Sequence, residues 1–296
     1  MAVKMDHGLG RFIHDNWPQK VSSKILYHYT SRNVLSLLLV RDSTLYCTRI
    51  DELNDKNENR WGFAYLARYL RRTCNWNRSD IVKMHKYCMF LMHAAKDYLP
   101  GSMSFSRVRN NDALWNGKGY VSKETGGYSI GFSQKDIVER ICKINAESTD
   151  HELLLVPMFY IGVDSDAINR IIEFYMSKIF GVLKDCMNYP EQWMRHIPVI
   201  SRLLLFPLFV KGKVWRGEEE TRLVFIYRGR MGQCKTFHIG GKNRYKGMEA
   251  VSKMIMHIDV SPFPCNGIQE LVDNAHLVLK KRKLHKRVAV HSTLGE

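Results

Sequence analysis

Two kinds of hydrophobic spacing follow one another irregularly along this chain, and their order limits the possible folds more than any other feature. Segments with alternating or continuous apolar residues, typical of strands, are separated by segments whose apolar residues recur every three or four positions, typical of helices. Strands are expected at residues 24–30, 45–50, 102–107, 127–132, 152–163, 222–227, 255–260 and 287–291. Because strands and helices do not alternate regularly, the pattern favours an α+β fold over a doubly wound sheet.

The helical segments fall into several blocks. Thr30 and Ser31 are suited to cap a short helix after the first strand, and two helices are expected between residues 61 and 98 around a turn near 75–79. A longer block runs from Ile168 to Leu183 and continues less regularly to Phe209. Since 296 residues lie at the upper end of what one domain holds, we expect a single domain over 1–296 with a helical insert at about 165–208.

Membrane and secretory signals are weak. The longest nearly uninterrupted apolar run, Leu203 to Val210, contains a proline and is far shorter than the roughly 20 residues of a transmembrane helix. The start of the chain is too polar for a signal peptide, and the seven cysteines are scattered singly with no C-x-x-C pair. We therefore expect a cytoplasmic protein with reduced thiols, no membrane partner and no metal site.

The charge is strongly positive. The chain has 45 lysines and arginines against 29 acidic residues, a formal net charge of +16, and a basic run at residues 280–287. Such a field attracts nucleic acid, acidic protein surfaces or the phosphates of a dinucleotide. A merely solvated basic face explains the same composition equally well.

Tyr27-His28-Tyr29-Thr30 is the first candidate site, at the end of a strand and before a helix. A histidine exchanges hydrogen-bonding roles near neutral pH, and the flanking tyrosines offer aromatic faces to a flat ring. A structural histidine whose hydrogen bonds are satisfied is the alternative interpretation.

The second candidate is the polar cluster Asn54-Asp55 with Glu58, which is suited either to fix its own loop or to contact a ligand hydroxyl.

The third candidate is Glu218-Glu219-Glu220 before Arg222. In an extended segment, Glu218 and Glu220 share one face, and their repulsion raises one pKa unless a cation offsets it. Arg222 on the same face provides that offset if the arrangement is purely structural.

Six short motifs give the chain a recognisable order: Leu26-Tyr-His-Tyr-Thr-Ser31, Leu53-Asn-Asp55 with Glu58, Ser104-Phe-Ser106, Leu114-Trp115, Gly131-Phe132 and Trp215-x-x-Glu218-x-Glu220-x-Arg222. In this order they resemble the bacterial family known as domain of unknown function 2971. The closing Val288-Ala-Val-His-Ser292 is similar to that family's last strand, whereas residues 167–209 and the basic segment near Lys280 depart from it.

That family in turn resembles the ADP-ribosyltransferases, in which a histidine strand, a central serine strand and a late glutamate strand occur in the same order. The resemblance implies a mixed, mostly antiparallel β core with helical insertions and an enzyme that uses NAD as its substrate. Glu218 or Glu220 would be the late glutamate, and His28 would hold the ribose on the nicotinamide side. The remaining NAD-binding candidates are Tyr29, Thr30, Asn54, Ser104, Ser106, Trp115, Tyr120 and Arg222.

Three functions stay open at this point. The first is an ADP-ribosyltransferase, of the kind found in bacterial toxins and phage-defence effectors, that modifies RNA, DNA or protein and has an antitoxin or regulatory partner. The second is a non-enzymatic protein that binds a nucleotide or nucleic acid. The third is a nuclease or phosphotransferase that uses His28 as acid or base. The sequence contains no G-x-x-x-x-G-K-[ST] phosphate loop and no G-x-G-x-x-G fingerprint.

Overall fold

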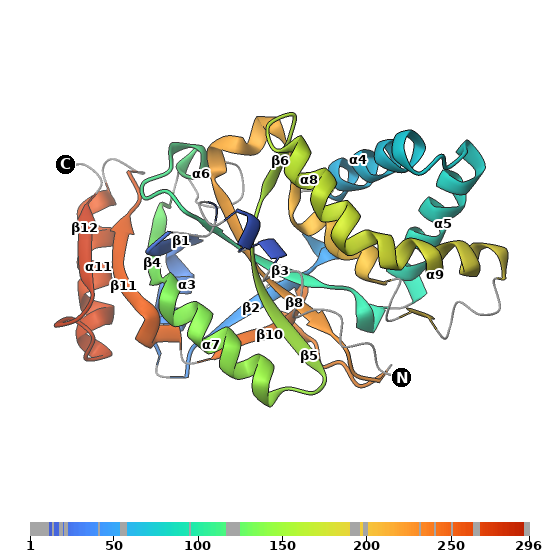
Figure 1. The fold of residues 1–296 in the computed structure, drawn as a ribbon. Helices are drawn as coiled ribbons and strands as arrows, with labels where there is room; N and C mark the ends of the chain where they lie inside the picture. Colours follow the sequence, from blue (N-terminus) through green and yellow to red (C-terminus); the bar gives the residue numbers. More distant parts are fainter. Residues whose placement is uncertain are drawn as a thin grey trace.

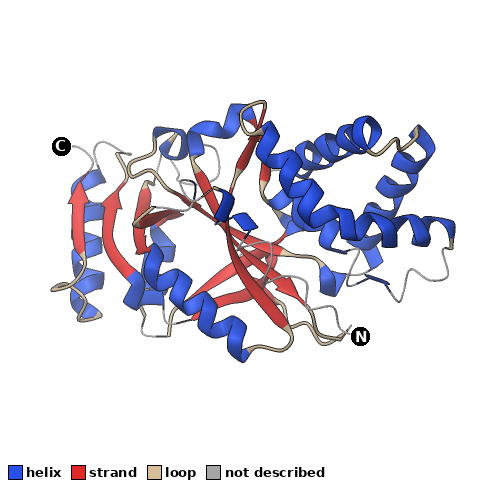
Figure 2. Cartoon of the chain, in the orientation of Figure 1, coloured by secondary structure: helices blue, strands red, loops and turns tan. Residues whose placement is uncertain are grey.

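The strand-like segments of the sequence form one large, twisted β-sheet, and helices surround it (Figures 1 and 2). The computed structural model describes residues 12–13, 15–17, 20, 23–40, 42–53, 58–94, 96–116, 125–189, 196–197, 201–230, 232–239, 241–249, 251–262 and 267–292. Most strand pairs are antiparallel, so the predicted α+β class with a mostly antiparallel sheet is confirmed at that level.

Ten strands make up the sheet. Eight of them follow the order β12-β11-β4-β1-β3-β2-β10-β9, and β8 and β5 extend the sheet from β3. Their bounds are β1 (Ile25–Ser31), β2 (Thr44–Arg49), β3 (Gly101–Ser106), β4 (Gly127–Ser133), β5 (His151–Pro157), β8 (Glu220–Tyr227), β9 (Phe237–Ile239), β10 (Lys242–Glu249), β11 (Ile255–Val260) and β12 (Ala289–Ser292). A separate parallel pair consists of β6 (Phe159–Ile161) and β7 (Val210–Gly212).

Strand β3 is the branch point of the sheet. Strand β8 pairs with it along its whole length, from Gly101 opposite Phe225 to Ser106 opposite Glu220. The other edge of β3 is shared, because β1 joins it opposite Ser106 and β2 joins it at Gly101 and Ser102. Within the described residues β1 and β2 pair with different ends of one strand and not with each other, so the sheet opens between them.

The described residues form α-helices, one π-helix and several short 3-10 helices. The α-helices are α3 (Arg32–Leu38), α4 (Glu58–Thr73), α5 (Arg78–Ala94), α6 (Asp112–Trp115), α7 (Gln134–Glu147), α8 (Ser165–Ile171), α9 (Ser177–Asn188) and α11 (Ile268–Lys281). A π-helix, η3 (Ile172–Met176), joins α8 to α9, and the 3-10 helices are η1 (Ile50–Glu52), η2 (Lys96–Tyr98), η5 (Ser201–Leu208), η6 (Lys213–Glu218) and η7 (Val251–Met254).

Helices α4, α5, α8 and α9 gather at one end of the molecule, at the right of Figure 1, whereas α11 packs against β11 and β12 at the opposite end. Helix α3 packs against α11, β1 and β4. Helix α7 packs against β4 and β5. Helix α4 approaches η5 closely at Gly62, where an added Cβ would lie 2.7 Å from the Cα of Pro207. A larger residue at position 62 would therefore push the two helices apart.

Most of the expected elements are present, and two expectations need correction. The apolar run predicted as one strand over 152–163 breaks at Met158 into β5, which pairs with β8, and β6, which pairs with β7. The sequence prediction also missed α7. Of the residues predicted as a helical insert at 165–208, those described are helical except Tyr189, mainly in α8, η3, α9 and η5. Their status as an insert in a single domain stays a prediction.

None of the helices in the described ranges is both long and apolar enough to cross a membrane.

Candidate functional site

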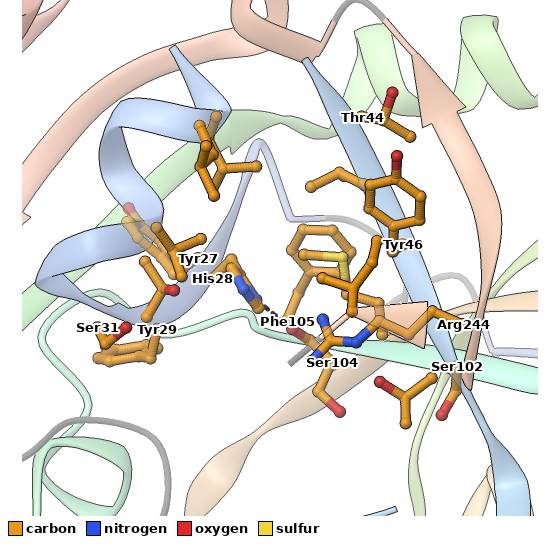
Figure 3. A pocket seen from close by; sticks show the side chains of 18 of the residues that line it. Tyr27, His28, Tyr29, Ser31, Thr44, Tyr46, Ser102, Ser104, Phe105 and Arg244 are labelled. Atoms are coloured by element: carbon orange, nitrogen blue, oxygen red, sulfur yellow. Dashed lines mark hydrogen bonds between the residues drawn. The ribbon is translucent and has the colours of Figure 1, made fainter. Parts of the chain in front are cut away.

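An open cavity of about 710 Å³ lies where the sheet branches. Its walls come from β1, β2, β3, α3 and the start of β10, and Glu218 and Glu220 also line it. Figure 3 shows side chains from β1, β2, β3 and β10 around this space, among them His28, Tyr46, Ser104 and Arg244. The cavity falls in the size range of small-molecule and cofactor sites, which is roughly 300–1,000 Å³.

His28 enters the cavity from β1 in a defined tautomer. Its Nδ1 lies 3.0 Å from the carbonyl oxygen of Ser104 (dashed in Figure 3). Since a carbonyl oxygen only accepts hydrogen bonds, Nδ1 carries the proton and Nε2 is left as an acceptor. Burial lowers the pKa of His28, and the nearby Arg244 lowers it further, although the bond to Ser104 opposes them. The ring is therefore neutral at neutral pH and offers an acceptor to a ligand hydroxyl.

Ser104 joins the histidine strand to the glutamate strand. Its backbone carbonyl accepts from His28, and its hydroxyl donates to Oε1 of Glu220 on β8. Antiparallel pairing places Ser104 opposite Arg222, so the hydroxyl lies beside the first residues of β8. One serine thus connects the two groups that the sequence singled out separately.

Four buried ionic side chains form a network below Ser104. The ammonium group of Lys211 donates to Oε2 of Glu218 at 2.8 Å and to Oε2 of Glu220 at 2.6 Å. Nε of Arg222 donates to Oε1 of Glu220 at 2.6 Å. All four side chains are at most 6% exposed, and the two carboxylates balance the two cations. Charges this well buried are tolerated because they are paired.

The two carboxyl groups of this network differ in acidity. Burial raises the pKa of Glu218, and the neighbouring Glu220 carboxylate adds to the increase while Lys211 opposes it. Burial alone would also raise the pKa of Glu220, but Arg222 and Lys211 outweigh it and hold that pKa well below its usual range. Pairs of acids whose pKa values are driven apart are common where one acts as an ion and the other exchanges a proton.

The route by which Glu218 and Glu220 meet differs from the expectation. The sequence predicted an extended segment with both glutamates on one face. Instead Glu218 ends the 3-10 helix η6, Glu219 takes a left-handed conformation with φ of 45°, and the strand begins only at Glu220. The predicted convergence with Arg222 is present, and Lys211, which the sequence prediction missed, is the cation that joins the two carboxylates.

Asn111 and Ser106 hold this irregular turn in place. The Asn111 amide donates to the carbonyl oxygens of Gly217 and Glu218 at 2.8 and 3.2 Å, and its carbonyl oxygen caps α6. The Ser106 hydroxyl donates to the carbonyl of Glu218 at 2.9 Å. Ser106 lines the cavity, and its hydrogen bonds also give it a structural role.

Strand β10 supplies two cations that the sequence prediction did not assign to the site. Strands β9 and β10 form a hairpin, which brings Lys242 and Arg244 to the cavity wall. Nε of Arg244 is buried and has no hydrogen-bond partner among the described residues. Burial lowers the pKa of Lys242, and the positive charge of Arg244 lowers it further. Among the described residues, Arg244 forms no ion pair with a carboxylate, so its positive charge is available to an anionic group in the cavity.

The other sequence candidates divide into three groups. Tyr29 and Thr30 line the cavity beside His28, and burial raises the pKa of Tyr29 to about 12, so its hydroxyl stays protonated. Trp115 and Arg222 are both 2% exposed and are not among the lining residues, because Trp115 packs edge-on against Tyr29 and Arg222 lies beneath Glu220. Asn54, Asp55 and Tyr120 lie outside the described residues, as does the Glu58 side chain.

The described residues bring no three His, Cys, Asp or Glu side chains into a geometry that could hold a metal ion.

Comparison of the chain with protein-family models, with curated proteins and with solved structures found no match.

Proposed function

We propose that the cavity binds NAD and that the protein transfers the ADP-ribosyl group of NAD to an acceptor. The observation that carries this proposal is the meeting of His28, Ser104 and Glu220 in one cavity beside Arg244, although these residues come from four separate strands. The order of the histidine, serine and glutamate strands supports a fold of the ADP-ribosyltransferase type.

The donors and acceptors of the cavity fit the chemistry of a dinucleotide. Nε2 of His28 is available to accept a hydrogen bond from a ribose hydroxyl. Arg244 has a buried donor without a partner among the described residues, and a guanidinium is well suited to a pyrophosphate. Tyr27, Tyr29 and Tyr46 supply aromatic surface along the wall for flat rings.

Glu220 suits the difficult step of the reaction. When the bond between nicotinamide and ribose breaks, its electron pair leaves with the nicotinamide ring, and positive charge develops on the sugar. An ionised carboxylate in a water-poor site stabilises that charge more strongly than it stabilises the ground state. The low pKa of Glu220 keeps it ionised throughout the neutral range, and the Ser104 hydroxyl fixes its orientation.

Glu218 suits the second half of the reaction. The acceptor attacks the sugar carbon and loses a proton, which needs a base nearby. A carboxylate whose pKa is raised is a stronger base than an ordinary glutamate, and Glu218 lines the cavity with its pKa raised by burial. In this scheme Glu220 stabilises charge and Glu218 receives the proton.

The test is the release of nicotinamide from NAD by the purified protein, with a cell extract as the source of acceptors. Glu220→Gln should slow the release by about 10²–10³-fold, which is the usual cost of removing a charge-stabilising group. Ser104→Ala removes one hydrogen bond to the ionised Glu220 and should slow the release by about tenfold.

Glu219→Gln is the matched control, because this neighbouring glutamate pairs with Arg107 and does not line the cavity. It should keep the wild-type rate. Thermal melting of each variant shows whether it folds. Folded Glu220→Gln protein that releases nicotinamide at the wild-type rate would rule out the proposed role of Glu220.

One observation favours a second candidate, a protein that binds a nucleotide without cleaving it. Both oxygens of Glu220 already accept hydrogen bonds from cations, and the network has no net charge. A carboxylate compensated in this way stabilises a developing cation less strongly. This candidate predicts NAD binding that weakens in Arg244→Gln, with no nicotinamide released by the wild-type protein.

A further inference from the structure

A dense basic cluster lies at and beyond the C-terminal end of α11, outside the cavity. It contains Lys280, Lys281, Arg282, Lys283, Lys286 and Arg287, all exposed, together with Lys253 from η7, and we name these seven residues the C-terminal basic cluster. The sequence has no aspartate or glutamate between residues 274 and 292. A local excess of this size marks the surface where a polyanion is attracted most strongly.

The turn that carries the cluster is well defined. Helix α11 ends in a tight turn in which the amide of Leu284 donates to the carbonyl of Leu279 at 2.9 Å and the amide of Lys283 donates to the carbonyl of Lys280 at 3.1 Å. Lys283 takes the left-handed position of this turn, with φ of 58°, where glycine is usually preferred. The backbone conformation alone would favour an uncharged glycine here, so it does not explain why this position carries a lysine.

Helix stabilisation explains only part of the cluster. Lys280 and Lys281 lie in the last turn of α11, where cations interact favourably with the helix dipole. Arg282, Lys283 and Lys286 follow the helix, and Lys253 belongs to a different element, so the dipole does not account for them. None of the seven forms an ion pair with a carboxylate among the described residues.

A chain of hydrogen bonds connects the cluster to the cavity. The Arg287 guanidinium donates to the carbonyl oxygens of Ser252 and Lys253. The amide of Ser252 in turn donates to the hydroxyl of Ser43 at 3.0 Å. Ser43 and Thr44 line the cavity at the start of β2, whereas Arg244 lies opposite Thr48 at the other end of that strand. The cluster therefore adjoins the end of the cavity farthest from Arg244.

We propose that the C-terminal basic cluster binds the phosphate backbone of a nucleic acid and holds it next to the cavity. Seven cations on and beside a well-defined turn suit a repeating phosphate chain, and contacts of this kind are independent of base sequence. A membrane surface fits less well, because the apolar side of α11, with Ile268, Leu271, Ala275 and Leu279, is buried against the sheet. Only the use of the bound nucleic acid as ADP-ribose acceptor rests on the proposed function.

Fluorescence anisotropy of labelled 30-nucleotide RNA, single-stranded DNA and duplex DNA tests the binding, in the absence of NAD and at several salt concentrations. The variant changes Lys280, Lys281, Arg282 and Lys283 to Gln. It should lose at least tenfold in affinity near 0.1 M salt, and its dependence of log K on log salt should become shallower by about 3, since each phosphate contact contributes roughly 0.7–0.9.

The control changes Arg71, Arg72, Lys83 and Lys86 to Gln. These residues are exposed on α4 and α5, and the change removes the same number of charges from the other end of the molecule. Its affinity should stay within twofold of the wild type. Equal loss in both variants, wild-type protein that binds none of the probes, or preferred binding to phosphatidylserine vesicles would overturn the proposal. Because NAD is absent, none of these outcomes bears on NAD cleavage.

Discussion

Removal of the Lys211 ammonium group should destabilise the protein strongly, because two buried carboxylates depend on it. Lys211 is 4% exposed and lies 2.8 Å from Glu218 and 2.6 Å from Glu220. In Lys211→Met the network keeps two carboxylates and only the Arg222 cation. Breaking a buried ion pair in this way costs about 3–5 kcal/mol. At about 2 °C per kcal/mol for a chain of this length, the melting temperature should fall by about 6–10 °C.

The double variant Lys211→Met with Glu218→Gln separates this explanation from a general loss of packing. It restores the balance between Glu220 and Arg222, so it should recover much of the lost stability. Lys213→Met is the matched control, since Lys213 is exposed two residues away and its replacement should change stability by less than about 0.5 kcal/mol. A Lys211→Met protein as stable as the wild type, or a double variant no more stable than the single one, would show that the two buried carboxylates do not depend on Lys211.

The stability lost in Lys211→Met should also depend on pH. The pKa of Glu218 is raised in the folded protein, so its contribution to stability is complete below its unfolded value near 4.5 and is lost as pH rises through the folded pKa. Loss of Lys211 raises that pKa further. The stability deficit of Lys211→Met should therefore be larger at pH 8 than at pH 5.5, as measured by denaturant titration at both values.

Three further predictions concern the surroundings of the site. Asn111→Ala removes the cap of α6 and two hydrogen bonds to the carbonyl oxygens of Gly217 and Glu218. It should lower the free energy of unfolding by about 1–3 kcal/mol, as measured by urea unfolding. Gly131→Ala should lower the melting temperature, because its Cβ would lie 2.7 Å from the ring of His257. Arg109→Met should cost about 3 kcal/mol at pH 7 by leaving the fully buried Asp259 without its guanidinium partner. The pKa of Asp259 is lowered because His257 and Arg109 outweigh burial. The contribution of Asp259 to stability is therefore present above pH 3.8 and is lost as pH falls through the folded pKa. The stability lost in Arg109→Met should shrink over the same fall in pH.

The sequence predicted most of the strands because their apolar residues alternate or run together at strand length, but it missed β7, β9 and β10. It did not predict how they branch. The sharing of one edge of β3 by β1 and β2 depends on pairing between segments far apart in the chain, which local spacing does not encode. The break at Met158 was missed for the same reason, since β5 and β6 differ in their partners and not in their apolar character. Helix α7 did carry a signal, with Ile137, Ile141 and Ile144 at helical spacing after the cap Ser133.

The site was predictable in part. His28, Ser104 and Glu220 are short-range signals, because each lies at a strand with an unusual polar pattern. Lys211 lies in the short strand β7, and Arg244 lies between Lys242 and Lys246 in β10; only the fold shows that Lys211 meets the glutamates and that Arg244 lines the cavity. The turn at residues 217–220 could not be predicted from residue spacing, because the left-handed conformation of Glu219 changes the faces on which an extended segment would place Glu218 and Glu220.

In the proposed function, NAD occupies the cavity and contacts His28 through Nε2. Nuclear magnetic resonance of protein labelled with ¹⁵N-histidine tests it most directly, with His28→Phe used to assign the His28 signals. We expect a neutral ring protonated at Nδ1 near pH 7, whose Nε2 resonance shifts as NAD is added. A ring protonated at Nε2, or a His28 signal that saturating NAD leaves unchanged, would contradict it.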